Sequence, residues 1–130
     1  MYVLDTNTLI YFFKGEGKVA RRMFQLPPGR IAVPAVVAYE LMVGIAKSLD
    51  SARRSSQLTE LLEVVVRLPF DMAAAEHAAA VRAALEKKGK GIGPMDTLIA
   101  GTTLAHDGVL VTRNTREFAR VKGLRLENWY

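Results

Sequence analysis

The chain of 130 residues contains no cysteine and only two histidines. The lack of cysteine excludes disulfides, thiolate metal sites and a cysteine nucleophile, and it favours a reducing compartment. His77 lies in an alanine-rich stretch and His106 follows another apolar segment. Neither histidine has a ligand-like spacing to a second candidate ligand, which disfavours zinc chemistry.

Long apolar runs are also missing. The longest one, Ile31 to Tyr39, is interrupted by a proline and is much shorter than the roughly 20 residues that span a bilayer. The first residues include Asp5 and lack the basic segment of a secretory signal. We therefore expect a cytoplasmic protein that is not associated with a membrane.

Acidic residues are outnumbered, with 13 Asp and Glu against 18 Lys and Arg, which gives a formal net charge of +5. Such a balance favours an anionic partner such as a nucleic acid, because counterion release rewards cations placed against phosphates. The basic residues gather in two segments, Lys87 to Lys90 and Arg113 to Arg125. For either segment alone, a solvated surface is the simpler interpretation.

The hydrophobic pattern predicts one α/β domain over residues 1–130, because half of the residues are hydrophobic and the length suits a single core. Short strand-like runs alternate with helical patterns, which predicts a parallel sheet covered on both faces. The predicted strands are residues 2–4, 30–33, 64–68, 109–112 and 124–127. Helix starts are predicted at Pro34, Asp71 and Pro94, and Gly89 and Gly91 end the helix that Asp71 begins.

Asp5 interrupts the apolar opening "MYVLDTNTLIYFF". It follows the first predicted strand, at the carboxyl edge of the sheet where open α/β folds bind ligands. Asp5 could also serve only as the N-cap of the next helix.

Glu40 lies in the predicted helix "PAVVAYELMVGIAKS", where its neighbours three and four residues away are apolar or glycine. No Lys or Arg lies at those spacings. A buried carboxylate without a partner is costly and normally pairs with a charge, binds a metal or becomes protonated. A partner from elsewhere in the fold is the alternative interpretation.

Asp96 repeats this pattern in "IGPMDTLIAGTTLA", within the first turn of a predicted helix. Helix capping alone would also explain it. Asp5, Glu40 and Asp96 together form a set of isolated acids with no neighbouring cation. Such a set indicates a hard divalent cation, Mg²⁺ or Mn²⁺, which prefers oxygen ligands.

Four segments resemble the PIN-domain ribonucleases and, within that family, the VapC toxins of toxin-antitoxin pairs. They are "VLDTNTLIYF", "VPAVVAYELMVGIAKS", "IGPMDTLIAGTTLA" and "LVTRNTREFARVKGLRLENW", which extend over nearly the whole chain. The resemblance implies a three-layer α/β/α sandwich with a parallel sheet. It also implies that Asp5, Glu40 and Asp96 form an acidic metal site.

Asn114 departs from the family pattern, because many PIN domains carry a fourth acid at this place. Here a neutral amide stands between Thr112 and Glu117. Many VapC toxins are similar at this position, so the resemblance still implies activity. We expect Asn114 to take part in catalysis and, with Thr112, to orient water or the scissile phosphate.

The resemblance implies phosphodiester hydrolysis of RNA, for which a metal site of this kind is suited. Single-stranded loops are the expected substrate, and toxins with this "DTN" opening resemble those that cut the anticodon loop of initiator transfer RNA. The side chains expected to hold the RNA backbone are Arg113, Arg116, Lys88 and Lys90. The implied partners are a VapB antitoxin, operator DNA contacted only through that antitoxin, and a second copy in a homodimer.

Three other functions compete with this interpretation. A catalytically degenerate PIN domain would bind RNA or a protein without cleaving. A receiver-type phosphoacceptor would need an aspartate after its third strand and a lysine after its fifth, and "VVVRLPF" and "LRLENW" supply neither. A phosphatase with an aspartyl nucleophile would need a second aspartate where Asn7 stands.

Overall fold

The computed structural model describes residues 1–130 and contains five parallel strands in one sheet, in the order β3-β2-β1-β4-β5. The strands are β1 (Tyr2–Leu4), β2 (Ile31–Pro34), β3 (Val66–Leu68), β4 (Val109–Val111) and β5 (Arg125–Glu127). Because β1 pairs with both β2 and β4, it occupies the centre of the sheet. The predicted parallel sheet is confirmed.

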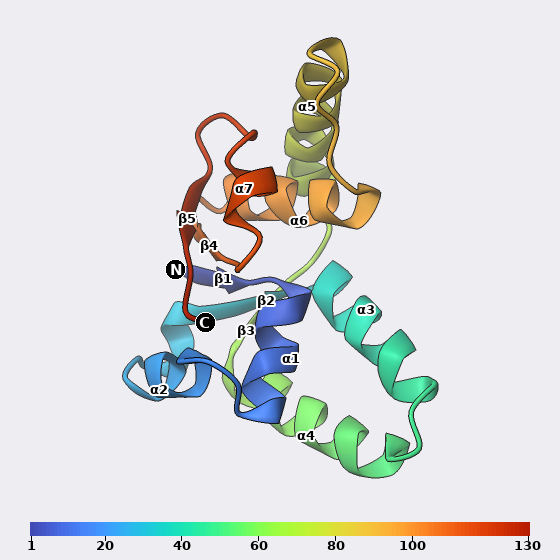
Figure 1. Cartoon of the computed structure of the whole chain (residues 1–130), viewed down its shortest axis with the longest axis vertical. Coiled ribbons are helices and arrows are strands. Elements are labelled where there is room, and N and C mark those ends of the chain that lie inside the picture. The colour runs from blue at the N-terminus through green and yellow to red at the C-terminus, as the bar shows by residue number, and fades with distance from the viewer.

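Helices cover the sheet on both sides (Figure 1), which confirms the predicted three-layer α/β/α sandwich. The helices are α1 (Thr6–Lys14), α2 (Val19–Phe24), α3 (Ala35–Ala46), α4 (Ser51–Val64), α5 (Met72–Lys87), α6 (Pro94–Ala105) and α7 (Thr115–Phe118), with a 3₁₀ turn, η1 (Pro28–Arg30). In Figure 1, α5 and α6 lie above the sheet, whereas α1, α3 and α4 lie below it. None of these helices combines the length and the apolar character needed to cross a bilayer.

The helix boundaries agree with most of the local sequence signals. The Asp71 side chain accepts a hydrogen bond of 3.0 Å from the Ala74 amide and caps α5, as predicted. Pro94 begins α6. Beyond the end of α5, Gly89 adopts a φ of 66° in the left-handed region, where glycine is favoured.

Several strand boundaries differ from the predictions by one or two residues, and two of these differences have a local cause. Pro34 was predicted in the first turn of a helix, but it ends β2 in extended conformation and is the N-cap of α3. Its missing N–H costs little at this last strand position. The strand predicted over residues 64–68 begins only at Val66, because α4 continues to Val64 and keeps its helical hydrogen bonds.

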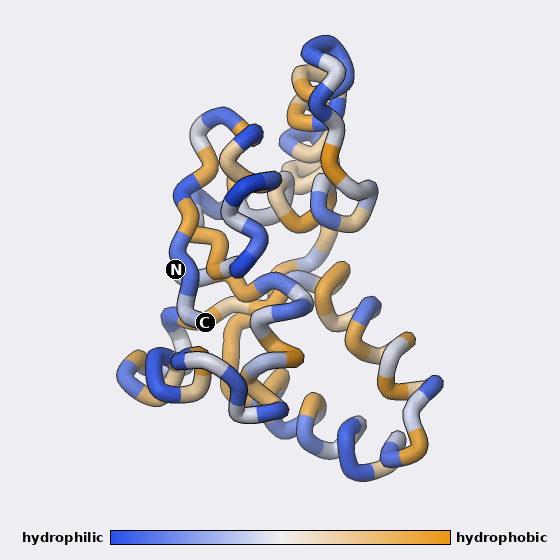
Figure 2. Tube along the Cα trace, in the orientation of Figure 1, coloured by the Kyte–Doolittle hydropathy of each residue, from blue (hydrophilic) through white to orange (hydrophobic).

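The hydrophobic core lies along the two central strands. Val3, Leu4, Leu110 and Val111 have no solvent exposure. Figure 2 shows the apolar colours concentrated in the strands and the hydrophilic colours at the tip of α5. A rigid, fully buried sheet centre therefore fixes the positions of the residues that follow β1 and β4.

The contact between α5 and α6 is unusually close at one point. A Cβ atom on Gly101 of α6 would lie 2.5 Å from the Cβ and backbone nitrogen of Ala78 in α5. Only glycine permits the two backbones to approach in this way. The contact fixes the direction of α6, and thereby the place of Asp96 in its first turn.

Candidate active site

Asp5 lies directly after β1, at the carboxyl edge of the sheet, and is 5% exposed. Its Oδ1 accepts a hydrogen bond of 2.9 Å from the Thr8 amide, and its Oδ2 accepts one of 2.6 Å from the Thr112 hydroxyl. Asp5 is therefore the N-cap of α1 and also a member of the sheet-edge group. The predicted position at the carboxyl edge and the predicted N-cap are both confirmed, and two hydrogen bonds fix the orientation of the carboxylate.

Glu40 is half-buried in α3, which packs against α1. Its Oε1 accepts a hydrogen bond of 2.6 Å from the Thr6 hydroxyl in the first residue of α1. The partner from elsewhere in the fold is thus a neutral hydroxyl. It orients the carboxylate but leaves its negative charge without a counterion.

Asp96 is half-buried in the first turn of α6, and its carboxyl has a pKa raised from 3.8 to about 6. Burial is the largest cause, followed by the negative charges of Asp5, Glu40 and Glu117. Capping does not explain the residue, because the N-cap of α6 is Gly93 and the helix has no side-chain cap. The structure therefore brings all three predicted acids within electrostatic reach of one another.

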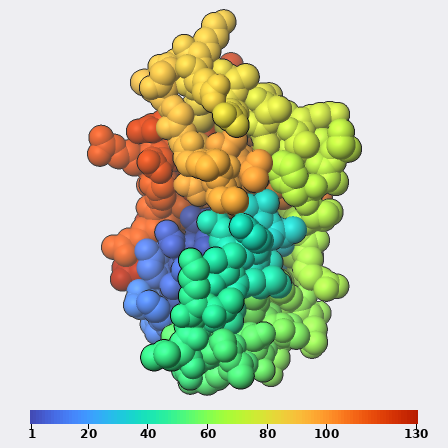
Figure 3. Space-filling view, turned by 90° about the vertical axis from the view of Figure 1, so that its right-hand side faces the viewer, coloured from blue at the N-terminus to red at the C-terminus, as the bar shows by residue number.

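Figure 3 faces the side of the molecule on which these elements meet, with the start of α6 in orange, α3 in cyan and α1 in blue. The α6 segment lies directly above α3, in agreement with the contacts between the two helices. The acids thus come from both halves of the molecule.

Glu117 is a fourth acid at this place that the sequence interpretation did not include as a site residue. It is half-buried in α7, and its charge contributes to the raised pKa of Asp96. The signal was its position just after β4, at the carboxyl edge of the strand beside β1. Glu117 was not identified from the sequence because it lies in the basic segment "TREFAR", where an acid looks like part of a solvated surface.

Asn114 connects Glu117 to the rest of the site. Its side-chain amide donates a hydrogen bond of 2.6 Å to Glu117 Oε2, and its backbone N–H donates one of 3.0 Å to the Thr112 hydroxyl oxygen. Thr112, fully buried, in turn donates to Asp5. Asn114 and Thr112 therefore act on the positions of two carboxylates.

No cation neutralises these acids. The four ion pairs of the protein are Arg22–Glu127, Arg53–Asp50, Arg82–Glu86 and Arg125–Asp107. None of them includes Asp5, Glu40, Asp96 or Glu117. The four acids therefore have no directly paired cation.

The donor atoms fit a hard, hydrated cation. All are carboxylate oxygens, which Mg²⁺ and Mn²⁺ prefer, and no three of the side chains approach closely enough to enclose an ion by themselves. Mg²⁺ commonly retains several waters and binds through one or two carboxylates and substrate phosphates. His77 and His106 are exposed and lie outside the site, and His77 contacts the Ala73 carbonyl of its own helix.

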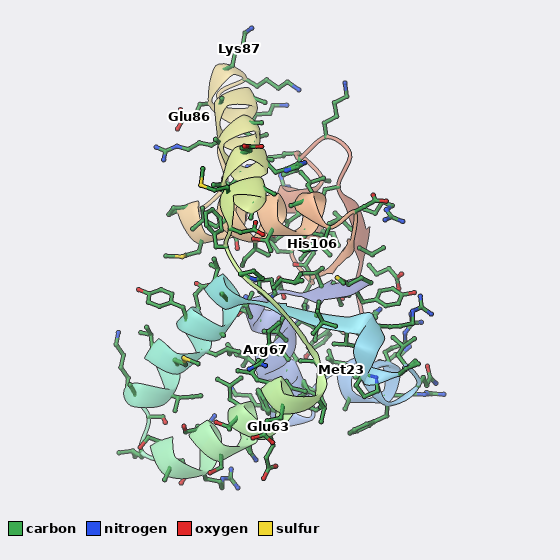
Figure 4. All side chains as sticks on the ribbon, turned by 180° about the vertical axis from the view of Figure 1, so that it is seen from behind. Met23, Glu63, Arg67, Glu86, Lys87 and His106 are labelled. Atoms are coloured by element: carbon green, nitrogen blue, oxygen red, sulfur yellow. The ribbon has the colours of Figure 1, made fainter.

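The basic residues predicted to hold RNA lie at different distances from the acids. Arg113 and Arg116 are exposed and follow β4 directly. Lys88 and Lys90 are exposed beyond the end of α5. Figure 4 shows their neighbour Lys87 at the tip of that helix, pointing away from the body of the protein. The structure thus places two arginines beside the acids and two lysines far from them.

An apolar cavity of about 230 Å³ adjoins Glu40 between α1, α3 and α4. Ile10, Phe13 and Ile45 form part of its wall, and Lys14 and Arg54 supply its positive charge. A side chain that enters this cavity would lie next to the acidic site.

The sequence matches the family model described as "PIN domain" over residues 2–124. It is 37% identical over 128 residues to the "tRNA(fMet)-specific endonuclease VapC" of Shigella flexneri, covering 98% of this chain and 97% of the relative. Among solved structures, it resembles VapBC2 from Rickettsia felis bound to a promoter DNA fragment, with a TM-score of 0.92, 33% identity and coverage of 99% and 98%. DNA-bound VapBC from Salmonella typhimurium is similar to the same degree, with a TM-score of 0.92, 36% identity and coverage of 99% and 98%.

Proposed function

This chain belongs to the PIN-domain family, within its VapC ribonuclease branch, and we propose that it is a metal-dependent endoribonuclease that cuts single-stranded loops of RNA. The observation that carries the proposal is the group of acids around Asp96, which form no ion pair and, together with burial as the largest cause, raise the pKa of Asp96 to about 6. A site that repels its own charge in this way favours binding of a cation. Alternatives without metal chemistry leave this repulsion unexplained.

A bound Mg²⁺ or Mn²⁺ would supply charge stabilisation at the phosphate and lower the pKa of water. Asp5, Glu40 and Asp96 would hold the hydrated ion, in part through its bound waters, with Glu117 as a further acid of the site. Thr112 and Thr6 fix the orientation of Asp5 and Glu40 through hydrogen bonds of 2.6 Å. This arrangement reduces the cost of ordering the carboxylates when the ion and the substrate bind.

Initiator transfer RNA is the proposed substrate, cut in its anticodon loop. The support is the name of the similar Shigella flexneri protein, a tRNA(fMet)-specific endonuclease. Unstacked loop bases are also what sequence-specific RNA readers generally recognise.

The experiment is cleavage of purified initiator and elongator transfer RNAs with Mg²⁺, with Mn²⁺ and with EDTA, followed by mapping of the cut ends. We expect cuts in the anticodon loop of the initiator that require the metal. Undiminished cleavage in EDTA would refute the metal dependence. Tight RNA binding without cleavage under any condition would support the degenerate, binding-only alternative.

A VapB-type antitoxin is the proposed protein partner, and operator DNA would be contacted only through it. Similar proteins from Rickettsia felis and Salmonella typhimurium were crystallised as DNA-bound VapBC complexes. We propose that a segment of the antitoxin fills the cavity beside Glu40 and covers the acids. Coexpression with the neighbouring small reading frame should relieve growth arrest and yield a copurifying complex.

We further propose a homodimer. The outer face of α3 exposes Tyr39, Met42 and Val43 to 55%, 53% and 39%, and these residues lie at the i, i+3 and i+4 spacing of one helix face. Contiguous exposed apolar side chains of this kind mark interaction surfaces. Sedimentation velocity should show a dimer for the parent and a monomer for Met42→Glu.

A further inference from the structure

Tyr11, Arg113 and Tyr130 form a stacked cluster on the surface. The Arg113 guanidinium carbon lies 3.6 Å from the centre of the Tyr130 ring and 5.7 Å from that of Tyr11. The two tyrosine rings meet edge to face, with 4.8 Å between their centres. Arg113 forms no ion pair with an acid and is exposed, so its guanidinium contacts the two tyrosines and remains accessible to solvent.

The cluster lies next to the acidic site. Arg113 stands in sequence between Thr112, which holds Asp5, and Asn114, which holds Glu117. Tyr11 lies one turn after Thr8 on α1 and therefore on the same helix face. Thr8 is directed toward β4, because its hydroxyl donates a hydrogen bond of 3.0 Å to the Val111 carbonyl.

Tyr130 is held by the residue before it and by the segment between α1 and α2. Trp129 is 3% exposed, and its carbonyl accepts a hydrogen bond of 3.0 Å from the Lys18 amide. Gly17 adopts a φ of 65°, and a Cβ atom there would lie 2.7 Å from the Tyr130 backbone. The backbone of Tyr130 is therefore held in place, and the ring itself contacts Tyr11 and Arg113.

We propose that Arg113, supported by Tyr130 and Tyr11, is a stacking platform for one unpaired nucleobase beside the cleavage site. The proposal rests on the proposed function, since the ligand is single-stranded RNA. Unpaired bases stack on arginine planes and aromatic rings. A guanidinium that already stacks on an aromatic ring is held in one orientation, which lowers the cost of ordering it when a base stacks beside it. Arg113 is thus assigned to a base, in place of the backbone contact that the sequence suggested.

The test measures RNA binding by fluorescence anisotropy in the Asp96→Asn background, which prevents cleavage during the measurement. The ligand is a labelled single-stranded oligoribonucleotide with an anticodon-loop sequence, together with a series of copies that each lack one base. For the parent site, one abasic position should weaken binding by about tenfold, which is the size of a stacking contact. Arg113→Ala should weaken binding of the intact RNA by a similar factor and abolish the effect of that abasic position.

Conservative variants distinguish the contribution of the planar guanidinium of Arg113 from that of its positive charge. Arg113→Lys keeps the charge and loses the planar group, so it should behave as Arg113→Ala does in affinity while the salt dependence of binding stays at the parent value. Tyr130→Phe keeps the ring and should bind as the parent. Arg30→Ala is the matched control, because Arg30 also lies over a tyrosine ring, 5.4 Å from the centre of Tyr2, but before β2 at the opposite edge of the sheet.

Three results would overturn the proposal. Parent-like binding by Arg113→Lys, with a reduced salt slope in Arg113→Ala, would make Arg113 a phosphate contact. A lower melting temperature for Arg113→Ala with unchanged RNA binding would show that the cluster only stabilises the C-terminal segment of the fold. Loss of antitoxin affinity alone would assign it to the protein interface. Binding is measured without cleavage, so the two proposals can fail separately. An abasic effect in a protein that does not cut RNA would refute the proposed nuclease activity and still support the proposed stacking of a base on Arg113.

Discussion

The Thr112 hydroxyl holds the Asp5 carboxylate across 107 residues of sequence, through a hydrogen bond of 2.6 Å. The same oxygen accepts a hydrogen bond of 3.0 Å from the backbone N–H of Asn114. One fully buried hydroxyl therefore connects the ends of two neighbouring strands, β1 and β4. The geometry of the site depends on this connection.

Replacement of Thr112 by valine should destabilise the fold by about 1–3 kcal/mol, because it leaves the buried Asp5 oxygen and the Asn114 N–H without this partner. Activity should fall as well, and Thr112→Ser should restore both. Thr103→Val is the control, since that buried hydroxyl contacts only the Ile99 carbonyl of its own helix. Urea denaturation of the three variants measures the difference, and equal losses for Thr112→Val and Thr103→Val would contradict the role assigned to Thr112.

Asp96 should make the metal-free protein less stable as pH rises. Its folded-state pKa of about 6 lies above the ordinary 3.8, so the folded state binds its proton more tightly than the unfolded state does. The resulting penalty is absent below about pH 4, grows between pH 4 and 6, and is complete above pH 6. In EDTA, Asp96→Asn should therefore melt above the parent at pH 7.5, and the difference should vanish near pH 4.

A divalent metal ion should reverse the order of the two melting temperatures. A divalent ion at about 100 times its dissociation constant stabilises the folded state by roughly 2.7 kcal/mol if it binds only that state. The parent should gain this in Mn²⁺, whereas Asp96→Asn should gain less. A variant that melts below the parent in EDTA and retains the full Mn²⁺ shift would show that Asp96 is not a ligand.

The three acids could be predicted from the sequence because each interrupts an apolar pattern. Asp5, Glu40 and Asp96 stand out against neighbours that belong to the core. Glu117 does not, since its sequence neighbours are polar and basic, and only the packing of α7 shows that its charge reaches Asp96. A charge is conspicuous in sequence only where its surroundings are apolar.

Side-chain partners were less predictable than the fold. The contact of Arg113 with Tyr130 depends on where β5 leaves the sheet, which no local pattern specifies. The hydroxyl of Thr6 that orients Glu40 likewise comes from a different helix. The parallel sheet follows from the alternation of strand and helix patterns, whereas these contacts follow from the packing of the finished layers.

Gly101→Ala should destabilise the protein by about 1–3 kcal/mol, although alanine is the better helix former. The added Cβ would lie 2.5 Å from Ala78, so α5 and α6 would have to separate. Gly44→Ala in α3 is the matched control, because its Cβ would meet nothing within 4 Å. That variant should gain about 0.5–1 kcal/mol. Thermal melts that show the same sign for both variants would contradict the close contact.

Arg116 and the lysines of the α5 tip should differ in which RNA they contact. Arg116→Ala should reduce the salt slope of binding by about one for both a short oligonucleotide and a whole transfer RNA. Lys88 lies ten residues beyond Ala78, about 15 Å along the helix from the crossing with α6. The double variant Lys88→Ala, Lys90→Ala should therefore change the slope only for the transfer RNA. An unchanged slope for Arg116→Ala would assign that residue to the solvated surface.

Glu117 and Asn114 should differ in their effect on cleavage, although a hydrogen bond of 2.6 Å joins them. Asp5→Asn and Asp96→Asn should abolish cleavage and growth arrest, because each replaces a charged oxygen of the proposed metal site by an amide. Asn114→Ala removes only the group that orients Glu117, so activity should fall by about 10- to 100-fold, the usual cost of losing a residue that positions a metal ligand. Glu117→Gln keeps an oxygen that can accept from Asn114 but removes the charge. If Glu117 acts as a fourth acid of the metal site, Glu117→Gln should lose more activity than Asn114→Ala. It should also require a higher Mn²⁺ concentration for half-maximal cleavage. Titration of Mn²⁺ in single-turnover cleavage distinguishes the two: a larger loss for Asn114→Ala than for Glu117→Gln would place Asn114 at the substrate and leave Glu117 outside the metal site.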